Sequence, residues 1–323
     1  MRLSSLPRRA THREYAEAAA ELEDALASAP GCVAVYRTGG ISAPGISDLD
    51  RILVADGPAR DVWPELSPRT RELAMHTPFA ADVATFERHR TLAHVEPLER
   101  ARGEAVAVHE RPEPELLELV IGAEGATVLL LQLAKTAVTG TAKVRPLLCL
   151  LHGLRHDLAL ARLSREDAPR AWQLGDDVAA LRAAWFDRTD APARFLELLA
   201  DAPGAIGGAL DAMAARASPF LAGERDGLTL RTPWQRARVR GGAHASFRAF
   251  TPPLLRTRRA GELAWRALGA NVVLPPPLLA LLAGDVAVPY RDVIHGRQEL
   301  AAEHERTRPA GYGTLGLAPI FLA

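Results

Sequence analysis

Apolar residues recur along the chain with a spacing that changes twice. Between residues 11 and 111 a helical stretch is followed by short apolar runs bounded by Gly, Pro and Ser, a pattern typical of helices alternating with strands. From Glu113 to Ala217 the apolar positions follow a helical period, and from 228 to 250 they alternate in places. The pattern predicts an α+β protein with an α/β domain over 11–111 and a mostly helical domain over 112–323, which carries a small β element near 228–250.

The first domain begins with a helix. Thr11 and Glu14 have the spacing of a capping box, the apolar positions that follow share one helical face, and Pro30-Gly31 ends the helix. Apolar runs then predict strands on either side of a Gly-rich loop, and a third strand over 78–86.

The second domain is predicted to be a helical bundle. Gly, Pro and Asp punctuate its apolar pattern at intervals of helix length. The predicted helices cover 115–137, 144–163, 167–186, 193–200 and 205–217.

The stretch from Val33 to Ala55 carries the main candidate chemistry. Asp48 and Asp50 are separated by one residue at the start of an apolar run. Residues i and i+2 of a strand point to the same face, so the two carboxylates are expected side by side while Leu49 turns into the core. Two adjacent carboxylates repel each other unless a cation lies between them, and hard ions such as Mg²⁺ take oxygen ligands. The pair therefore predicts a metal site.

The loop before this pair suits a phosphate. Gly39-Gly40 follows the first strand and can present backbone N–H groups without a side chain in the way, and Ser42 and Ser47 add hydroxyl donors. Together with the aspartates, this loop indicates Mg²⁺-assisted chemistry on a nucleoside triphosphate. The alternative is an ordinary Gly/Pro/Ser turn before a strand that begins with Asp.

This arrangement of strand, Gly39-Gly40, loop and Asp48-Leu49-Asp50 resembles the signature of the polymerase-β-type nucleotidyltransferase superfamily. The resemblance covers only the N-terminal part. It implies a nucleotidyltransferase-like domain with a mixed sheet that transfers a nucleotidyl group from ATP or another NTP to an acceptor, which no motif here identifies. It also implies two metal ions held by the carboxylates. Nucleotidyltransferases of the kanamycin type carry a helical bundle behind the catalytic domain, in the same order.

The resembled family often has a third carboxylate on a neighbouring strand, which can act as a general base. Asp82, in the predicted third strand, is the candidate for this catalytic role. Glu104 and Glu110 compete with it, and the alternative is that all of these acids are simply exposed.

Three features depart from the family pattern. The loop from Ile41 to Ser47 is short, Arg51 stands where an apolar residue is usual, and Gly40 replaces a serine. They motivate a second hypothesis, in which the chain is catalytically inactive and serves as a nucleotide-binding or protein-interaction module, for example in a toxin–antitoxin-like pair.

The helical domain offers weaker signals. Arg145 and His152 fit the loose Arg-x(4–6)-His pattern of HEPN domains, and His152 and His156 have the i, i+4 spacing of a metal-binding pair. An ordinary helix face is the alternative. Further on, arginines gather around a predicted Gly241-Gly242 hairpin and would attract an anionic ligand, unless they are a solvated surface. These arginines are Arg231, Arg236, Arg238, Arg240, Arg248, Arg256, Arg258 and Arg259.

Composition narrows the class of protein. The 39 basic residues balance 39 acidic ones, so the chain as a whole is not a polyanion binder. Cys32 and Cys149 are too few for a disulfide framework or a zinc site, and both lie in apolar runs. The basic N-terminus is followed by a charged helical stretch rather than by the apolar segment of a signal peptide. A cytoplasmic protein with no membrane association is expected.

Overall fold

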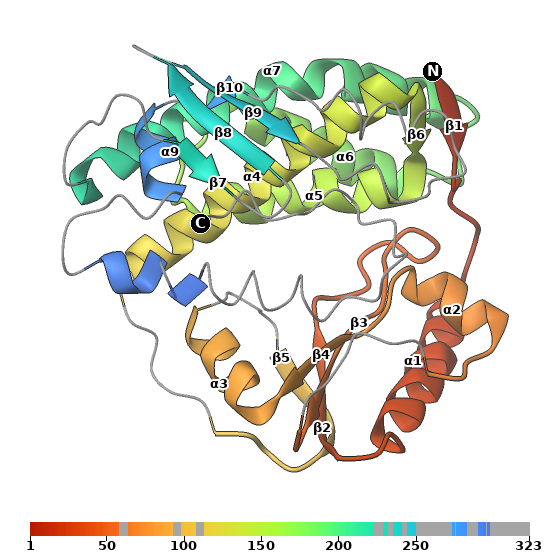
Figure 1. Cartoon of the computed structure of the whole chain (residues 1–323). Helices are drawn as coiled ribbons and strands as arrows, with labels where there is room; N and C mark the ends of the chain where they lie inside the picture. The colour runs from red at the N-terminus through yellow and green to blue at the C-terminus, as the bar shows by residue number, and fades with distance from the viewer. Residues whose placement is uncertain are drawn as a thin grey trace. The chain divides into compact units, whose positions relative to one another are not determined.

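The chain folds into two compact units. The computed structural model describes residues 1–57, 64–92, 98–107, 113–221, 229–231, 235–240, 244–249, 273–274, 276–282, 290–294 and 296–297. Pro7–Pro112 belongs to an α/β unit, whereas Met1–Leu6 and Glu113–Ala302 belong to a mostly helical unit. The α/β unit is therefore inserted into the helical unit, after its first six residues (Figure 1).

The α/β unit is built on a four-stranded mixed sheet. The strand order is β4-β3-β2-β5, in which β3 and β4 run parallel and the other neighbours run antiparallel. The mixed sheet confirms the coarse prediction for this part of the chain. The strands are β2 (Cys32–Thr38), β3 (Asp50–Ala55), β4 (Phe79–Asp82) and β5 (Leu98–Gly103), and the helices are α1 (His12–Ala27), α2 (Pro68–Ala74) and α3 (Val83–Leu92).

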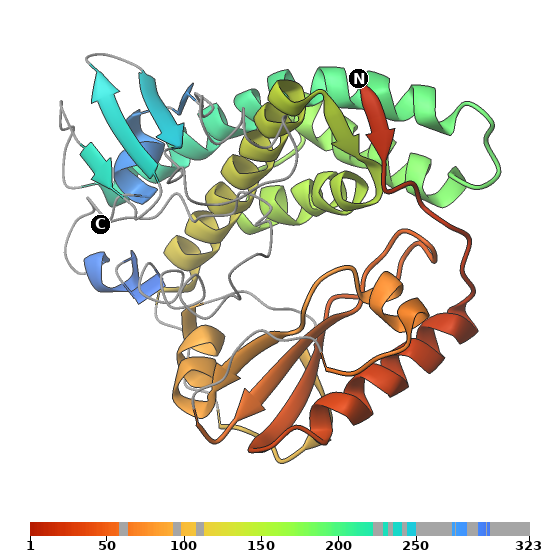
Figure 2. The same ribbon diagram turned by 45° about the vertical axis from the view of Figure 1, so that its right-hand side comes forward.

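Alternation along the strands gives the sheet two apolar faces. Val35 and Leu53 pack on the side of α1 and α2, while Tyr36, Val54 and Phe86 belong to a second cluster on the side of α3 (Figures 1 and 2). Both faces are covered at the two central strands, so β2 and β3 read as nearly continuous apolar runs in the sequence. The capping box predicted for α1 is confirmed by reciprocal hydrogen bonds between Thr11 and Glu14.

One prediction for this unit was wrong, and one strand was missed. The segment over 78–86 is a strand only as far as Asp82, after which the chain turns into α3. The Asp82 side chain accepts a hydrogen bond from the Thr85 N–H at 2.7 Å, so it caps the helix that replaces the rest of the predicted strand. Strand β5 was not predicted, because its sequence Leu-Glu-Arg-Ala-Arg-Gly shows the charged pattern of an edge strand.

The helical unit contains the predicted bundle. Helix α4 packs on α5, α5 on α6, α6 on α7, and α7 returns to α4 (Figure 1). Two segments predicted over 193–200 and 205–217 form one helix, α7, which continues through the exposed Pro203. The four helices are α4 (Pro114–Thr139), α5 (Val144–Leu160), α6 (Pro169–Ala184) and α7 (Ala191–Ala217).

Two small sheets complete the helical unit. Strand β1 (Arg2–Ser4) runs parallel to β6 (Thr141–Lys143), which ties the start of the chain to the end of α4. The two strands of the predicted hairpin are confirmed as β8 (Gln235–Arg240) paired antiparallel with β9 (His244–Ala249), flanked by β7 (Thr229–Arg231) and β10 (Val273–Leu274), while the predicted Gly241-Gly242 turn lies outside the described residues. Helix α9 covers Pro276–Leu282. The arginines at 256, 258 and 259 lie outside the described residues.

Helix α4 is the most apolar helix of the bundle. Among the described helices, it alone is long and apolar enough to cross a membrane, over Pro114–Ala134, and 71% of its most apolar window is buried by its neighbours. Its Glu124 is also buried and accepts hydrogen bonds from Arg297 at 2.8 and 3.0 Å. The pattern of burial is that of a core helix.

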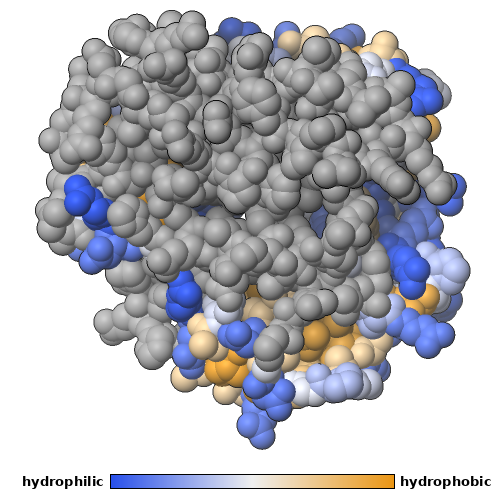
Figure 3. Space-filling model, viewed as in Figure 1, coloured by the Kyte–Doolittle hydropathy of each residue, from blue (hydrophilic) through white to orange (hydrophobic). Residues whose placement is uncertain are grey.

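The described surface has few large apolar side chains. Only Met1 and Leu6 are strongly exposed among the large hydrophobic residues described, at 60% and 53%. On the visible face of the α/β unit, apolar and charged residues are intermixed (Figure 3). Cys32 and Cys149 form no disulfide and are half-buried.

The two glycines inside α4 allow α5 to approach closely. A Cβ added at Gly122 would lie 2.4 Å from the Asp157 carbonyl oxygen, and one added at Gly125 would lie 2.3 Å from the Asp157 Oδ1. In contrast, a Cβ at the exposed Gly208 of α7 would meet nothing within 4 Å. The glycines of α4 are therefore required by packing, not by backbone conformation.

We expect Gly122→Ala to destabilise the protein by about 1–3 kcal/mol, because the new methyl group must push backbone away from backbone. Gly208→Ala should instead stabilise it by about 0.5–1 kcal/mol, the usual gain for a helix interior. Urea unfolding of both variants measures the difference. Equal effects of the two substitutions would show that α4 and α5 are not in close contact.

Candidate metal centre

Asp48 and Asp50 lie at one end of the central strand pair. Asp50 is the first residue of β3, opposite Thr38 at the end of β2, and Asp48 lies in the extended segment just before the strand. Leu49 is 2% exposed and joins the core on the α1 side. The predicted alternation is confirmed, although only Asp50 belongs to the strand itself.

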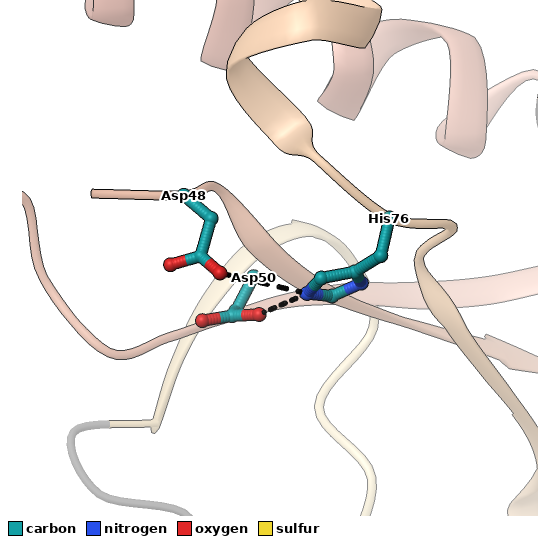
Figure 4. Close-up of side chains that lie close together, drawn as sticks. All are labelled: Asp48, Asp50 and His76. Carbon is teal, nitrogen blue, oxygen red and sulfur yellow. Dashed lines mark hydrogen bonds and ion pairs between the residues drawn. The ribbon is translucent and has the colours of Figure 1, made fainter. Parts of the chain in front are cut away.

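His76 completes the group. Its Nε2 atom lies 2.8 Å from Asp50 Oδ1 and 3.8 Å from Asp48 Oδ2 (Figure 4). One ligand atom from each residue lies within 4.8 Å of the others, and all three side chains are about one quarter exposed, at 23%, 30% and 26% for Asp48, Asp50 and His76. The three side chains are therefore close enough and accessible enough to hold a metal ion.

A tight turn between α2 and β4 places His76. The preceding residue, Met75, has φ 67° and ψ −42°, and the His76 N–H bonds the Ala74 carbonyl at 2.8 Å. A non-glycine residue in this conformation costs about 1–3 kcal/mol, and such residues cluster at functional sites. The imidazole Nδ1 lies 2.7 Å from the Thr77 carbonyl oxygen, and the ring packs at 5.5 Å from that of Phe79.

The charge on His76 is set by the two carboxylates. Burial alone would lower the pKa of His76, but the hydrogen bond and the negative charge of Asp50, with help from the Thr77 carbonyl and Asp48, raise this pKa to about 9. In the metal-free protein at neutral pH, a protonated imidazole therefore balances the aspartates. The pair does not remain uncompensated when no metal is bound.

The loop that carries Asp48 is fastened to α1. The Tyr15 hydroxyl, fully buried, donates to the Ser47 carbonyl at 2.5 Å and accepts from the Gly45 N–H at 3.1 Å. Within the loop, the Ser47 hydroxyl accepts from the Ala43 N–H at 3.1 Å. Ser47 is only 2% exposed, so its hydroxyl supports the loop rather than facing a ligand.

The glycine pair borders the carboxylates. Gly39 has φ +68°, and a Cβ built there would lie 3.5 Å from Asp50 Oδ2, so this position requires glycine and lies beside the candidate ligands. Gly40 and Ser42 are exposed, and a Cβ on Gly40 would meet nothing within 4 Å. Gly39 therefore lies directly beside Asp50, and Gly40, the next residue, faces open space.

The other predicted acids lie elsewhere. Asp82 pairs with Ala55, which is about 16 Å along β3 from Asp50 at ~3.3 Å per residue. Glu104 donates its N–H to the Val33 carbonyl, near the start of β2, again at the far end of the sheet. Glu110 lies outside the described residues. The structure brings Asp48 and Asp50 together with His76 and does not bring Asp82 or Glu104 to them.

Arg51, which departs from the family pattern, links the site to α1. Its Nε donates to Glu23 Oε1 at 2.9 Å, and one of its terminal nitrogens donates to the Asp50 carbonyl at 2.7 Å. Glu23 is fully buried and also accepts two hydrogen bonds from Arg37, at 2.6 and 2.7 Å, while Arg102 lies 3.4 Å away. This cluster holds the first residue of β3 in place.

The histidine pair of α5 does not resemble a metal site. Burial, with the charges of Arg182 and Arg155, lowers the pKa of His152 to about 4, and burial also lowers the pKa of His156. Cations beside an imidazole repel a metal ion. Among the described residues, Asp48, Asp50 and His76 are the only metal-ligating group of three or more.

His76 was missed at the sequence level. A lone histidine in Ala-Met-His-Thr-Pro carries no ligand spacing of its own. The signal that would reveal it is the parallel pairing of β3 and β4, in which Ile52 lies opposite Phe79. With that register, residues shortly before Ile52 and shortly before Phe79 meet at the same edge of the sheet.

Replacement of the buried Glu23 should lower the free energy of unfolding more than replacement of its buried partner Arg51. Glu23→Gln leaves the Arg51 guanidinium, 7% exposed, without its buried counter-charge, and should lower the free energy of unfolding by about 3 kcal/mol or more. Arg51→Met leaves Glu23 paired with Arg37 and should cost less. The exposed Glu17→Gln serves as the control, with little or no effect expected. Denaturant unfolding of the three variants checks this order.

His76 should make stability depend on pH in the metal-free protein. The folded-state pKa of about 9 exceeds the unfolded value of 6.5, so the stabilisation is complete below pH 6.5 and is lost as the pH rises through 9. A shift of this size corresponds to roughly 3 kcal/mol. With a chelator present, the free energy of unfolding of wild type should fall between pH 6.5 and about 9 relative to that of His76→Asn. His12→Asn, at an exposed position, should follow wild type; parallel curves for wild type and His76→Asn would contradict the ion pair.

Comparison with known proteins identifies no relative. None of the protein families, curated proteins or solved structures compared with the chain matches it. The functional argument therefore depends on the residues of the site.

Proposed function

We propose that the chain is a divalent-metal-dependent nucleotidyltransferase of the polymerase-β type, which transfers a nucleotidyl group from ATP or another NTP to an acceptor. One observation carries the proposal. Asp48 and Asp50 present adjacent carboxylates at the end of a strand, directly beside the exposed Gly39-Gly40 turn. Metal ligands and an open backbone turn next to each other suit a triphosphate with its metal ion.

Each residue of the site has a separate role in this proposal. Asp48 and Asp50 would hold the metal, and Gly39 with Gly40 would leave room for the phosphates to approach the backbone. Ser42 is exposed in the same loop and its hydroxyl would bind a phosphate oxygen, whereas the Ser47 hydroxyl bonds within the loop and supports its shape. A bound divalent ion would neutralise the charge that develops on the transferred phosphoryl group.

Two of the three side chains are the carboxylates that the family pattern implies, and the third is a histidine instead of a carboxylate. Asp48 and Asp50 match the oxygen ligands expected for Mg²⁺. The third side chain is His76, and no third carboxylate joins the group among the described residues. The expectation of two Mg²⁺ ions therefore has fewer oxygen ligands to support it than the family pattern implies.

The lack of a third carboxylate in this group, among the described residues, favours a second candidate. In this candidate the chain binds a nucleotide without catalysis or serves as a protein-interaction module. Asp82, the proposed general base, caps α3 at the far end of β3. A binding module needs the glycine loop and a metal ligand pair, but no base. Binding without turnover would select this candidate.

Isothermal titration of ATP in the presence of a divalent ion tests both candidates. The double variant Asp48→Asn, Asp50→Asn should weaken metal-dependent ATP binding by at least about tenfold, because it removes the charge that holds the ion. Asp82→Asn is the matched control, since Asn caps a helix as well as Asp does, and it should bind as wild type. Pyrophosphate release then separates the enzyme from the binding module. Equal ATP binding by wild type and the double variant would remove the nucleotidyltransferase and the nucleotide-binding module, and would leave only the protein-interaction module.

A further inference from the structure

The nitrogen ligand at this site bears on which ion it holds. We infer that Asp48, Asp50 and His76 form a site for a single transition-metal ion, represented by Mn²⁺, which it binds in preference to Mg²⁺. The inference rests on the proposed function in that it concerns the same site, and it specifies the cofactor class. It concerns binding by these side chains and requires no assumption about the acceptor.

The separations of the ligand atoms suit one ion. With metal–ligand bonds of ~2.0–2.2 Å, neighbouring ligand atoms around a metal lie roughly 3 Å apart. His76 Nε2 lies 2.8 Å from Asp50 Oδ1 and 3.8 Å from Asp48 Oδ2. The His76–Asp50 pair already has this separation, the His76–Asp48 pair would have to close from 3.8 Å to roughly 3 Å, and all three atoms lie within 4.8 Å of one another, so rotations of the aspartate side chains would place them around a common centre.

The orientation of the imidazole suits a ligand. Its Nδ1 lies 2.7 Å from the Thr77 carbonyl oxygen, an arrangement in which Nδ1–H donates and Nε2 faces the carboxylates, so a metal ion that displaces the Nε2 proton would meet the lone pair of this nitrogen. A backbone carbonyl that binds the second ring nitrogen is the usual partner of a metal-bound histidine, because it fixes the tautomer and the ring plane. The ring contact with Phe79 restricts rotation further.

Ligand chemistry then favours a transition metal. Mg²⁺ takes oxygen ligands and keeps several waters, whereas imidazole binds first-row transition metals well. A Mg²⁺ ion between the aspartates would use two of the three side chains, while Mn²⁺ would use all of them. Two ions ~3.5–4 Å apart need further carboxylates, and the described residues bring none to this group.

The test measures metal affinity without nucleotide. Metal-free protein is titrated with Mn²⁺, read by the loss of the free-ion electron paramagnetic resonance signal, and then with Mg²⁺ in competition. Wild type should bind Mn²⁺ at least about tenfold more tightly than Mg²⁺, and His76→Gln should lose at least about tenfold in Mn²⁺ affinity. His76→Asp makes an all-oxygen set and should narrow the Mn²⁺/Mg²⁺ ratio. His12→Gln, the same change at an exposed histidine, should leave both affinities unchanged.

A spectroscopic readout identifies the ligand itself. Pulsed paramagnetic resonance of the Mn²⁺-loaded wild type should show a coupled nitrogen nucleus, which should be absent from His76→Gln. Equal affinities for the two ions, or the same nitrogen coupling in both proteins, would overturn the inference while leaving the proposed nucleotidyltransferase in place. If neither ion binds wild type more tightly than the Asp48→Asn, Asp50→Asn variant, the proposed function fails as well.

Discussion

The burial of the Glu23 carboxylate is the constraint on which the α/β unit depends. A charged group removed from water costs several kcal/mol unless opposite charges and hydrogen bonds compensate it. Burial tends to raise the pKa of Glu23, but the hydrogen bonds and charges of Arg37 and Arg51 outweigh it and keep this pKa below its ordinary value. Glu23 therefore stays ionised, and α1 can pack on the sheet only where both guanidinium groups reach it.

That constraint extends to the candidate metal centre. Arg51 is held by Glu23 and in turn donates to the Asp50 carbonyl, so the start of β3 is fixed from the α1 side of the sheet. Tyr15 lies about two helix turns before Glu23 on α1, and its hydroxyl fixes the loop that leads into Asp48. The two carboxylates thus project from backbone that α1 supports at two points, which is the preorganisation that a binding site needs.

Like charges held together need a partner in every state of the protein. In the metal-free protein His76 supplies it, as an imidazolium beside both carboxylates. The strained turn at Met75 places the ring there, and the packing of α2 and β4 on the sheet compensates the cost of that turn. All three residues of the candidate metal group belong to the α/β unit. The helical unit has its own core, in which two glycines of α4 allow α5 to pack closely.

The sequence by itself determined the features that depend on local pattern. The extents of α1, α4, α5 and α6 follow closely from apolar periodicity and from the Gly, Pro and Asp residues near their ends, although α7 was predicted as two helices. The common face of Asp48 and Asp50 follows from the alternation of side chains along an extended chain. Only the tertiary structure decided which distant residue meets them. The pairing of β4 with β3 brings His76 to the carboxylates and places Asp82 near the far end of β3. The packing of α1 on the sheet gives Arg51, which departs from the family pattern, a buried partner in Glu23. Strand register and helix docking depend on contacts between segments far apart in the chain, which no local pattern of residues encodes.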